Sequence, residues 1–225
     1  LPGHLGVIMS LAFFDMDGTI VDGDTNNLTI NEYIRMKIAD PSMLDYLHEQ
    51  ERLFMIGKAD LDSFVEFAVK PLLKFSKEEQ ENILSSTIKK CIFPKVKKGA
   101  IRQIEFHKKR NDRIVIVTST CDYIVRHLAA LLGITDYIAA PMETADGRLT
   151  GKRCGLIPYQ QAKVTRIREF IQTENLSLDD SYAYGDTIND IPMLMLCAHR
   201  FAVDPSEGLL NSPEIHDLEI VNWKK

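Results

Sequence analysis

The sequence lacks any long run of apolar residues, and no stretch approaches the roughly 20 uninterrupted apolar residues that a membrane-spanning helix needs. Positive charge is also scarce, because 27 Lys and Arg residues are outnumbered by 32 Asp and Glu residues and leave a formal net charge of −5. Such a chain offers no general positive field to hold a polyphosphate backbone. We therefore expect neither a membrane nor a nucleic acid among its partners.

Closely spaced cysteines are absent as well. Without a Cys-x-x-Cys pair, neither a zinc ribbon nor a thioredoxin-type site is expected from the four cysteines, Cys91, Cys121, Cys154 and Cys197. Residues 1–7 have no basic n-region and no long apolar segment, so we do not interpret them as a secretory signal. Two disulfides remain possible, but we expect reduced thiols and a cytoplasmic location.

The chain does contain short apolar runs that predict buried strands. Its 225 residues, 45% of them hydrophobic, suffice for one large α/β domain or for a core with a small accessory domain. Runs at 10–14, 113–117 and 182–184 end abruptly in polar turns, and shorter runs lie at 199–203 and 218–221. Because these runs do not alternate with polar residues, they are typical of parallel strands that are covered on both faces.

Helical periodicity fills the segments between these strands. It predicts crossover helices at 100–109, 123–132, 159–173 and 188–197, which together with the strands indicate a doubly wound, mostly parallel sheet. An Asp-Gly turn within 141–150 predicts a small hairpin.

The segment after the first strand is purely helical in pattern. Apolar residues follow the i, i+3, i+4, i+7 spacing at Leu61, Phe64, Val65, Ala68 and Leu72. We predict that residues 22–95 form a separate helical cap domain, joined through linkers near 21–26 and 95–99. The catalytic core would then comprise residues 1–21 and 96–225.

Polar side chains gather where three of the predicted strands end. They are Asp15 and Asp17, Thr118 and Ser119, and Asp186 with Asp190. Ligands of open parallel sheets bind beyond the carboxyl ends of the strands, so these side chains should meet at one edge. Four carboxylates there would repel one another unless a hard cation with oxygen ligands joined them, and Mg²⁺ suits such a site.

An Asp-x-Asp pair at a strand end permits a division of labour. One carboxylate can attack phosphorus to give an acyl-phosphate, while the other protonates the leaving oxygen and later activates water. Lys163, at the start of a predicted helix, and the hydroxyl of Thr118 could position the phosphoryl oxygens.

Each feature also has a purely structural interpretation. An Asp-x-Asp-Gly segment is often a turn or a partial calcium loop, although an EF-hand is excluded because Gly18 falls at loop position 4. Thr118 and Ser119 could cap the following helix, Asp190 could be a first-turn acid, and Lys163 could be a solvated lysine. Their joint placement after three strands favours the catalytic interpretation.

Four segments resemble the motifs of the haloacid dehalogenase superfamily of phosphohydrolases. Residues 15–19 (Asp-Met-Asp-Gly-Thr) resemble its first motif, and 114–118, an apolar strand that ends in Thr, resembles its second. Lys163 sits where the third motif places a lysine, and 185–190 (Gly-Asp-Thr-Ile-Asn-Asp) matches the fourth. All four occur in the family's order. The fold implied is a Rossmann-like core with a helical cap inserted after the first strand.

The resemblance implies a role for each of these residues. Asp15 would be the nucleophile, and Asp17 would be the general acid/base and a metal ligand through its carbonyl. Asp186 would bind Mg²⁺ beside Asp15, with Asp190 supporting the metal shell. The phosphate would be held by Thr118, Lys163, Ser119 and Asn189.

The helical insertion is similar to the cap of the phosphoserine phosphatase-like branch, subfamily IB, as is the spacing Lys163-x-x-Arg166. In phosphoserine phosphatase, a glutamate after the first motif and a cap arginine bind the amine and the carboxylate of the substrate. The nearest positions here are Asp24 and Arg52. Arg52 has the equally open interpretation of a solvated surface arginine.

Together these features predict a Mg²⁺-dependent phosphatase that hydrolyses a small-molecule phosphomonoester through an aspartyl-phosphate. A phosphotransferase or phosphomutase with the same first half-reaction is the near alternative. A receiver-like signalling module would also use an aspartate and Mg²⁺, but it explains neither Asp17 nor the helical insertion. The expected partner is a small phosphorylated metabolite, and the expected state is a monomer or a homodimer.

Overall fold

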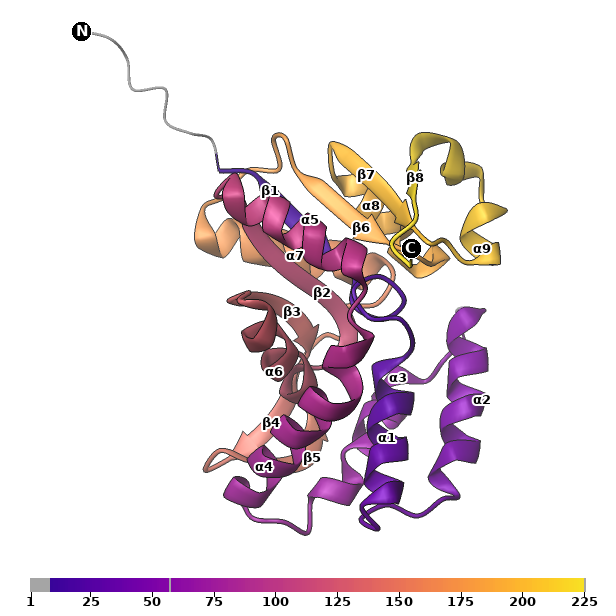
Figure 1. Cartoon of the computed structure of the whole chain (residues 1–225), viewed down its shortest axis with the longest axis vertical. Coiled ribbons are helices and arrows are strands. Elements are labelled where there is room, and N and C mark those ends of the chain that lie inside the picture. The colour runs from indigo at the N-terminus through magenta and orange to yellow at the C-terminus, as the bar shows by residue number, and fades with distance from the viewer. Residues whose placement is uncertain (1–8, 57, 225) are drawn as a thin grey trace, which may run out of the picture.

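A computed structural model describes residues 9–56 and 58–224, so the segment 1–7 considered as a signal lies outside the described residues. Its centre is a six-stranded sheet in which all neighbouring strands are parallel, in the order β3-β2-β1-β6-β7-β8 (Figure 1). The predicted α/β class and parallel sheet are confirmed. The strands are β1 (Leu11–Phe14), β2 (Arg113–Cys121), β3 (Asp136–Ala140), β6 (Tyr182–Gly185), β7 (His199–Val203) and β8 (Glu219–Val221).

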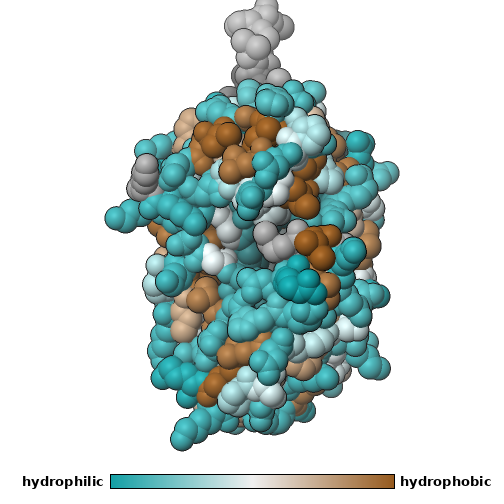
Figure 2. Space-filling view, turned by 90° about the vertical axis from the view of Figure 1, so that its right-hand side faces the viewer, coloured by the Kyte–Doolittle hydropathy of each residue, from teal (hydrophilic) through white to brown (hydrophobic). Residues whose placement is uncertain are grey.

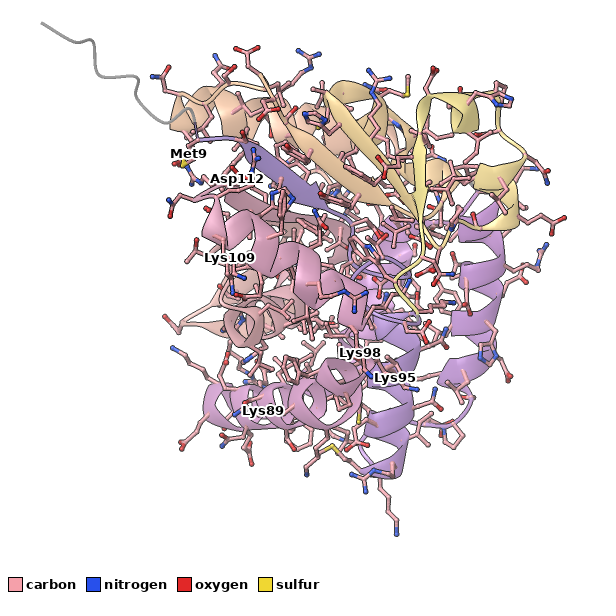
Figure 3. The ribbon with its side chains drawn as sticks, turned by 45° about the horizontal axis from the view of Figure 1, so that its top comes forward. Met9, Lys89, Lys95, Lys98, Lys109 and Asp112 are labelled. Atoms are coloured by element: carbon pink, nitrogen blue, oxygen red, sulfur yellow. The ribbon has the colours of Figure 1, made fainter. Side chains whose placement is uncertain are left out.

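Both faces of the sheet are covered, as the unbroken apolar runs predict. Along β1, Ala12 and Phe14 pack into one cluster of buried side chains, and Leu11 and Phe13 pack into the other. The first cluster includes residues of α5 (Lys98–Lys109) and α6 (Asp122–Leu132). The second includes α7 (Gln161–Glu174), α8 (Ile191–Leu196) and α9 (Glu207–Leu210). Figure 3 marks the two ends of α5 by Lys98 and Lys109.

The apolar runs miss one strand, β3. Only Ile138, Ala139 and Ala140 are buried in it, whereas Asp136 is half-buried and Tyr137 is exposed. β3 lies at the edge of the sheet and pairs only with β2. A strand with one neighbour buries fewer residues, so its apolar run is too short to stand out in the sequence.

The segment that follows β1 is helical, as expected (Figure 1). Of the apolar positions predicted to share a face, Phe64, Val65, Ala68 and Leu72 are buried. Local sequence sets where these helices begin: Asp24 accepts a hydrogen bond from the backbone N–H of Asn27 at the start of the first one. The elements are α1 (Thr25–Arg35), α2 (Met43–Met55), α3 (Leu61–Ala68), η1 (Lys70–Leu72), α4 (Lys77–Thr87), η2 (Ile88–Ile92) and η3 (Phe93–Lys95).

The two ends of this helical segment lie side by side. Val21 and Val96 form an antiparallel bridge, and the N–H of Asp22 donates to the carbonyl of Lys95 at 2.8 Å. These contacts fall within the two predicted linkers. The division into a core and a cap of residues 22–95 remains a prediction, and we call residues 22–95 the insertion.

The predicted hairpin is present and packs against the insertion. It consists of β4 (Met142–Ala145) and β5 (Arg148–Arg153), and both residues of its Asp-Gly turn have positive φ. The N–H of Leu149 donates to Oε1 of Gln80 at 3.1 Å, and Nη2 of Arg153 lies 2.7 Å from Oδ2 of Asp62. The hairpin therefore holds two helices of the insertion beside the sheet.

The surface formed by α2 and the C-terminal elements is largely hydrophilic, with hydrophobic residues in several separate patches (Figure 2). Among the helices that the structure describes, none combines the length and apolar character needed to cross a bilayer. The four cysteines are free thiols.

Close packing at the start of α5 gives a test of this fold. A Cβ atom on Gly99 would lie 2.3 Å from Cγ of Trp223, whose side chain is buried. Helix propensity alone favours Gly99→Ala by up to about 1 kcal/mol. We expect the clash with Trp223 to outweigh this gain in helix propensity and to lower the free energy of unfolding by about 1–3 kcal/mol. Urea denaturation measures the change.

Gly208→Ala is the matched control, because Gly208 is also the second residue of its helix and a Cβ there would meet only Cγ2 of Ile188, at 3.4 Å. Its stability should stay the same or increase. Equal effects of the two substitutions would contradict the packing described for Trp223.

Candidate active site

A cavity opens at the carboxyl ends of β1, β2 and β6. The sheet side contributes most of its polar lining: Asp15, Asp17, Thr118, Ser119, Thr120, Lys163, Thr187, Asn189 and Asp190. The insertion and the loop before α7 contribute the rest: Asp24, Asn26, Leu47, Gln50, Glu51, Phe54, Leu61, Phe64 and Tyr159. The predicted site residues at the three strand ends are thus brought to one edge of the sheet.

Three carboxylates form the centre of this site. Asp15, Asp186 and Asp190 each offer an oxygen, and these oxygens all lie within 4.8 Å of one another. Burial, followed by the neighbouring charge of Asp190, raises the pKa of Asp15 to about 7. Burial and the charge of Asp15 raise the pKa of Asp186 well above its usual value. Hard oxygen donors that repel one another in this way fit a divalent cation such as Mg²⁺.

Lys163 is the cation that the chain itself supplies to this cluster. Its Nζ lies 2.6 Å from Oδ1 of Asp15 and 2.6 Å from Oδ1 of Asp190, and it donates to the carbonyl of Val117 at 3.1 Å. Burial disfavours the charged form, but the two carboxylates outweigh it and raise the pKa of Lys163. With 3% of its surface exposed, Lys163 is not a solvated helix lysine.

Asp17 is held apart from the three carboxylates. Its Oδ1 accepts from the N–H of Thr25 at 2.7 Å, and its Oδ2 accepts from the hydroxyl of Thr120 at 2.6 Å. Burial raises the pKa of Asp17, while the hydrogen bonds from Thr120 and Thr25 oppose that shift. The side chain of Asp17 is not part of the cluster of metal-ligand oxygens. Its predicted contact with the metal, through the main-chain carbonyl, remains a prediction.

Gly18 lets the loop after β1 approach the loop after β6. Its φ is +80°, and a Cβ atom would lie 2.1 Å from Oδ2 of Asp186. Nζ of the buried Lys97 donates to the carbonyl of Gly18 and lies 2.8 Å from Oδ2 of Asp204. Thr19 donates to Oδ1 of Asp186 at 3.1 Å. The first motif therefore fixes the position of the acid that follows β6.

The residues predicted to hold phosphate line the same cavity. Thr118 and Ser119 lie inside β2, which continues to Cys121, so neither caps the helix that follows. Asn189 is held at both ends of its amide, because Oδ1 accepts from Gln160 at 3.0 Å and Nδ2 lies 3.4 Å from the carbonyl of Phe54.

Of the two residues predicted to bind the rest of the substrate, one lines the cavity and the other does not. Asp24 lines the cavity, where burial and the charge of Asp17 raise its pKa to about 7. Arg52 does not line the cavity, which favours the alternative interpretation of a solvated surface arginine. Its side chain is 63% exposed and pairs with Glu49 at 2.8 Å. Position 52 lies about 100° around α2 from position 51, so it turns away from the site.

Several lining residues were not identified from the sequence. On α2, Leu47, Gln50, Glu51 and Phe54 follow the i, i+3, i+4, i+7 spacing of one helix face, which was the available signal. Tyr159 was expected in the first turn of the predicted helix 159–173, but α7 begins at Gln161, and Tyr159 reaches the cavity from the loop before it.

The profile of the family described as haloacid dehalogenase-like hydrolase matches residues 12–195. The chain is 27% identical over 220 residues to the histidinol-phosphatase of Neisseria meningitidis serogroup C, covering 96% of this chain and 99% of that protein. It is 28% identical over 192 residues to the phosphoserine phosphatase of Methanocaldococcus jannaschii, covering 85% and 84%. A solved protein of unknown function from Bordetella pertussis Tohama I matches with a TM-score of 0.84 and 25% identity, covering 95% and 98%.

The ion pairs of Lys163 give a test of this geometry. Lys163→Met leaves Asp15 and Asp190 buried without their cation, so in EDTA we expect the free energy of unfolding to fall by about 3–5 kcal/mol. Urea denaturation measures the loss. The added substitution Asp190→Asn should restore part of it, because one of the two unpaired charges is then removed.

The exposed Lys98 provides the control, since Lys98→Met should change the stability by less than about 0.5 kcal/mol. A Lys163→Met protein as stable as this control would show that the two short ion pairs do not form.

Proposed function

We propose that this chain, which belongs to the haloacid dehalogenase-like hydrolase family, hydrolyses a small phosphomonoester through a covalent phosphate on Asp15. The observation that carries the proposal is the contact of Asp15 with Lys163 within a cluster of three carboxylates, beside a separately held Asp17. That two relatives, each matched over most of its length, are named as phosphatases supports the same reaction class.

In the first half-reaction, a carboxylate oxygen of Asp15 bonds to phosphorus as the bond from phosphorus to the ester oxygen breaks. Asp17 gives its proton to that oxygen, so the alcohol leaves neutral. In the second, Asp17 takes a proton from water, the water oxygen bonds to phosphorus, and the bond to Asp15 breaks. Inorganic phosphate leaves, and both aspartates return to their starting forms.

Asp15 and Asp17 have different hydrogen-bond partners, which suits one to act as nucleophile and the other as acid and base. Thr25 and Thr120 hold both oxygens of Asp17, so its carboxylate has one defined orientation. Lys163 offsets negative charge at Asp15 and would do the same for the phosphoryl oxygens. Thr118, Ser119 and Asn189 line the cavity and would donate to the remaining phosphate oxygens.

We assign Asp15, Asp186 and Asp190 as the side chains that would hold Mg²⁺, with Asp17 contributing its carbonyl. The bound ion would draw negative charge from the phosphoryl group and so favour attack by another anion.

Apolar residues on the insertion side of the cavity favour hydrolysis of a small metabolite over a receiver-like role. They line a recess in which an ester would be partly shielded from bulk water. Transfer to an acceptor other than water uses the same first half-reaction and is distinguished by its product. The cytoplasmic location and the monomeric or dimeric state remain predictions.

Replacing the proposed nucleophile tests the covalent step. Asp15→Asn should lower turnover of p-nitrophenyl phosphate by about 1000-fold or more and abolish the phosphoenzyme, because an amide is a poor nucleophile. Phosphoenzyme is measured after acid quenching, and thermal unfolding checks that the fold is retained. Asp22→Asn is the matched control, since Asp22 is an exposed acid of the same loop and pairs with Lys224 outside the cavity. Turnover by Asp15→Asn at the rate of this control would exclude Asp15 as the nucleophile.

Removing the metal tests the acidic cluster. EDTA should reduce turnover of p-nitrophenyl phosphate to background, and Mg²⁺ added in excess should restore it, because uncompensated carboxylates repel the phosphate. Full activity after exhaustive chelation would contradict the assignment of Asp15, Asp186 and Asp190.

A further inference from the structure

One part of the cavity lining is apolar and partly aromatic. Phe54 of α2 and Tyr159 of the core lie with ring centroids 5.0 Å apart, tilted by 40°. Leu47, Leu61 and Phe64 complete this part of the lining. Such a surface favours a substrate with a flat or apolar body, because each buried CH₂ contributes about 0.8 kcal/mol.

Two carboxylates, those of Asp24 and Glu51, line the same cavity. The backbone N–H of Asn27 donates to Oδ1 of Asp24 at 2.8 Å, and Nδ2 of the same residue donates to Oε2 of Glu51 at 2.9 Å. Asn27 therefore links an acid at the start of α1 to an acid on α2. Both acids line the cavity, so together they present negative charge to a ligand there.

The described lining of this apolar surface contains no cationic side chain. Among the described residues that line the cavity, Lys163 is the one cationic side chain, and it already contacts Asp15, Asp190 and the carbonyl of Val117. Arg52 points to solvent and pairs with Glu49. A substrate carboxylate would thus enter this cavity without a cation to receive it, and desolvating an unpaired charge is costly.

We infer that the substrate is the phosphate ester of an amino alcohol that carries a protonated amine near Asp24 and Glu51, has a flat or apolar body and lacks a carboxylate. The inference rests on the proposed function. It specifies which phosphomonoesters the cavity accepts, and it excludes phosphoserine as the preferred one.

Pairs of phosphate esters test the three features of the substrate one at a time: the missing carboxylate, the amine and the flat or apolar body. Phosphoethanolamine and phosphoserine differ in the carboxylate, and we expect kcat/KM to be about 10-fold or more higher for phosphoethanolamine. 2-Amino-3-phenylpropyl phosphate and 3-phenylpropyl phosphate differ in the amine, and the first should be favoured by a similar factor. Histidinol phosphate, which has an amine and a flat ring, should exceed phosphoethanolamine.

Two variants test where the amine binds. Glu51→Gln and Asp24→Asn should each reduce the preference for 2-amino-3-phenylpropyl phosphate over 3-phenylpropyl phosphate by about 5-fold or more, because each removes one negative charge. Asn remains a good N-cap residue, so Asp24→Asn should preserve the start of α1. Glu49→Gln, on the outer side of α2, should leave the ratio unchanged.

The outcomes distinguish the two proposals. Equal values for phosphoethanolamine and phosphoserine, a preference for phosphoserine, or an amine preference that survives both substitutions would overturn the substrate class while leaving the phosphatase intact. No turnover of any ester, p-nitrophenyl phosphate included, would overturn the proposed function and the substrate class with it.

Discussion

The arrangement depends on the ammonium of Lys163 lying between two buried carboxylates. Without it, Asp15 and Asp190 would share a desolvated edge of the sheet with Asp186, and each charge would raise the cost of the others. Hydroxyl groups add a second means of compensation: Thr187 donates to Asp190, and Thr19 donates to Asp186. The fold can therefore hold several acids in one place, which its hydrophobic core alone would not permit.

The crowding of acids at this edge of the sheet also explains why glycine is required at two positions. Asp186 approaches the loop after β1 so closely that any Cβ at position 18 would overlap its carboxylate. Gly185 is similarly confined, because a Cβ there would lie 2.5 Å from Cβ of Asp190. The missing side chain of Gly18 therefore lets the two loops approach each other, and that of Gly185 lets Asp190 lie against the end of β6. The parallel sheet directs both loops to the same edge.

Sequence reasoning identified the elements that have strong local signals. Buried runs predicted β1, β2 and β6, and the polar residues at their ends pointed to one region, where Asp15 lies beside both Thr118 in the cavity and Asp186 in the carboxylate cluster. It could not decide between neighbouring residues where the outcome depends on helix phase or on packing between distant segments. Arg52 and Glu51 are neighbours in sequence, yet only Glu51 lines the cavity, and a choice between them requires the orientation of α2 against the sheet. Helical periodicity assigned Tyr159 to the start of a helix, whereas it lies in the loop before α7, because the exact start of a helix is poorly fixed by periodicity.

Specific contacts join the side of the cavity at the strand ends to the side formed by the insertion. The carbonyl of Phe54, at the end of α2, faces both Nδ2 of Asn189 and the hydroxyl of Tyr159, each at 3.4 Å. The N–H of Thr25, at the start of α1, holds Asp17 at 2.7 Å. A displacement of α2 from the core would therefore disturb a residue assigned to phosphate, and a displacement of α1 would disturb the proposed acid/base. Because equilibrium coupling is reciprocal, a ligand that holds these helices in place also favours the arrangement of Asp17 and Asn189 described here.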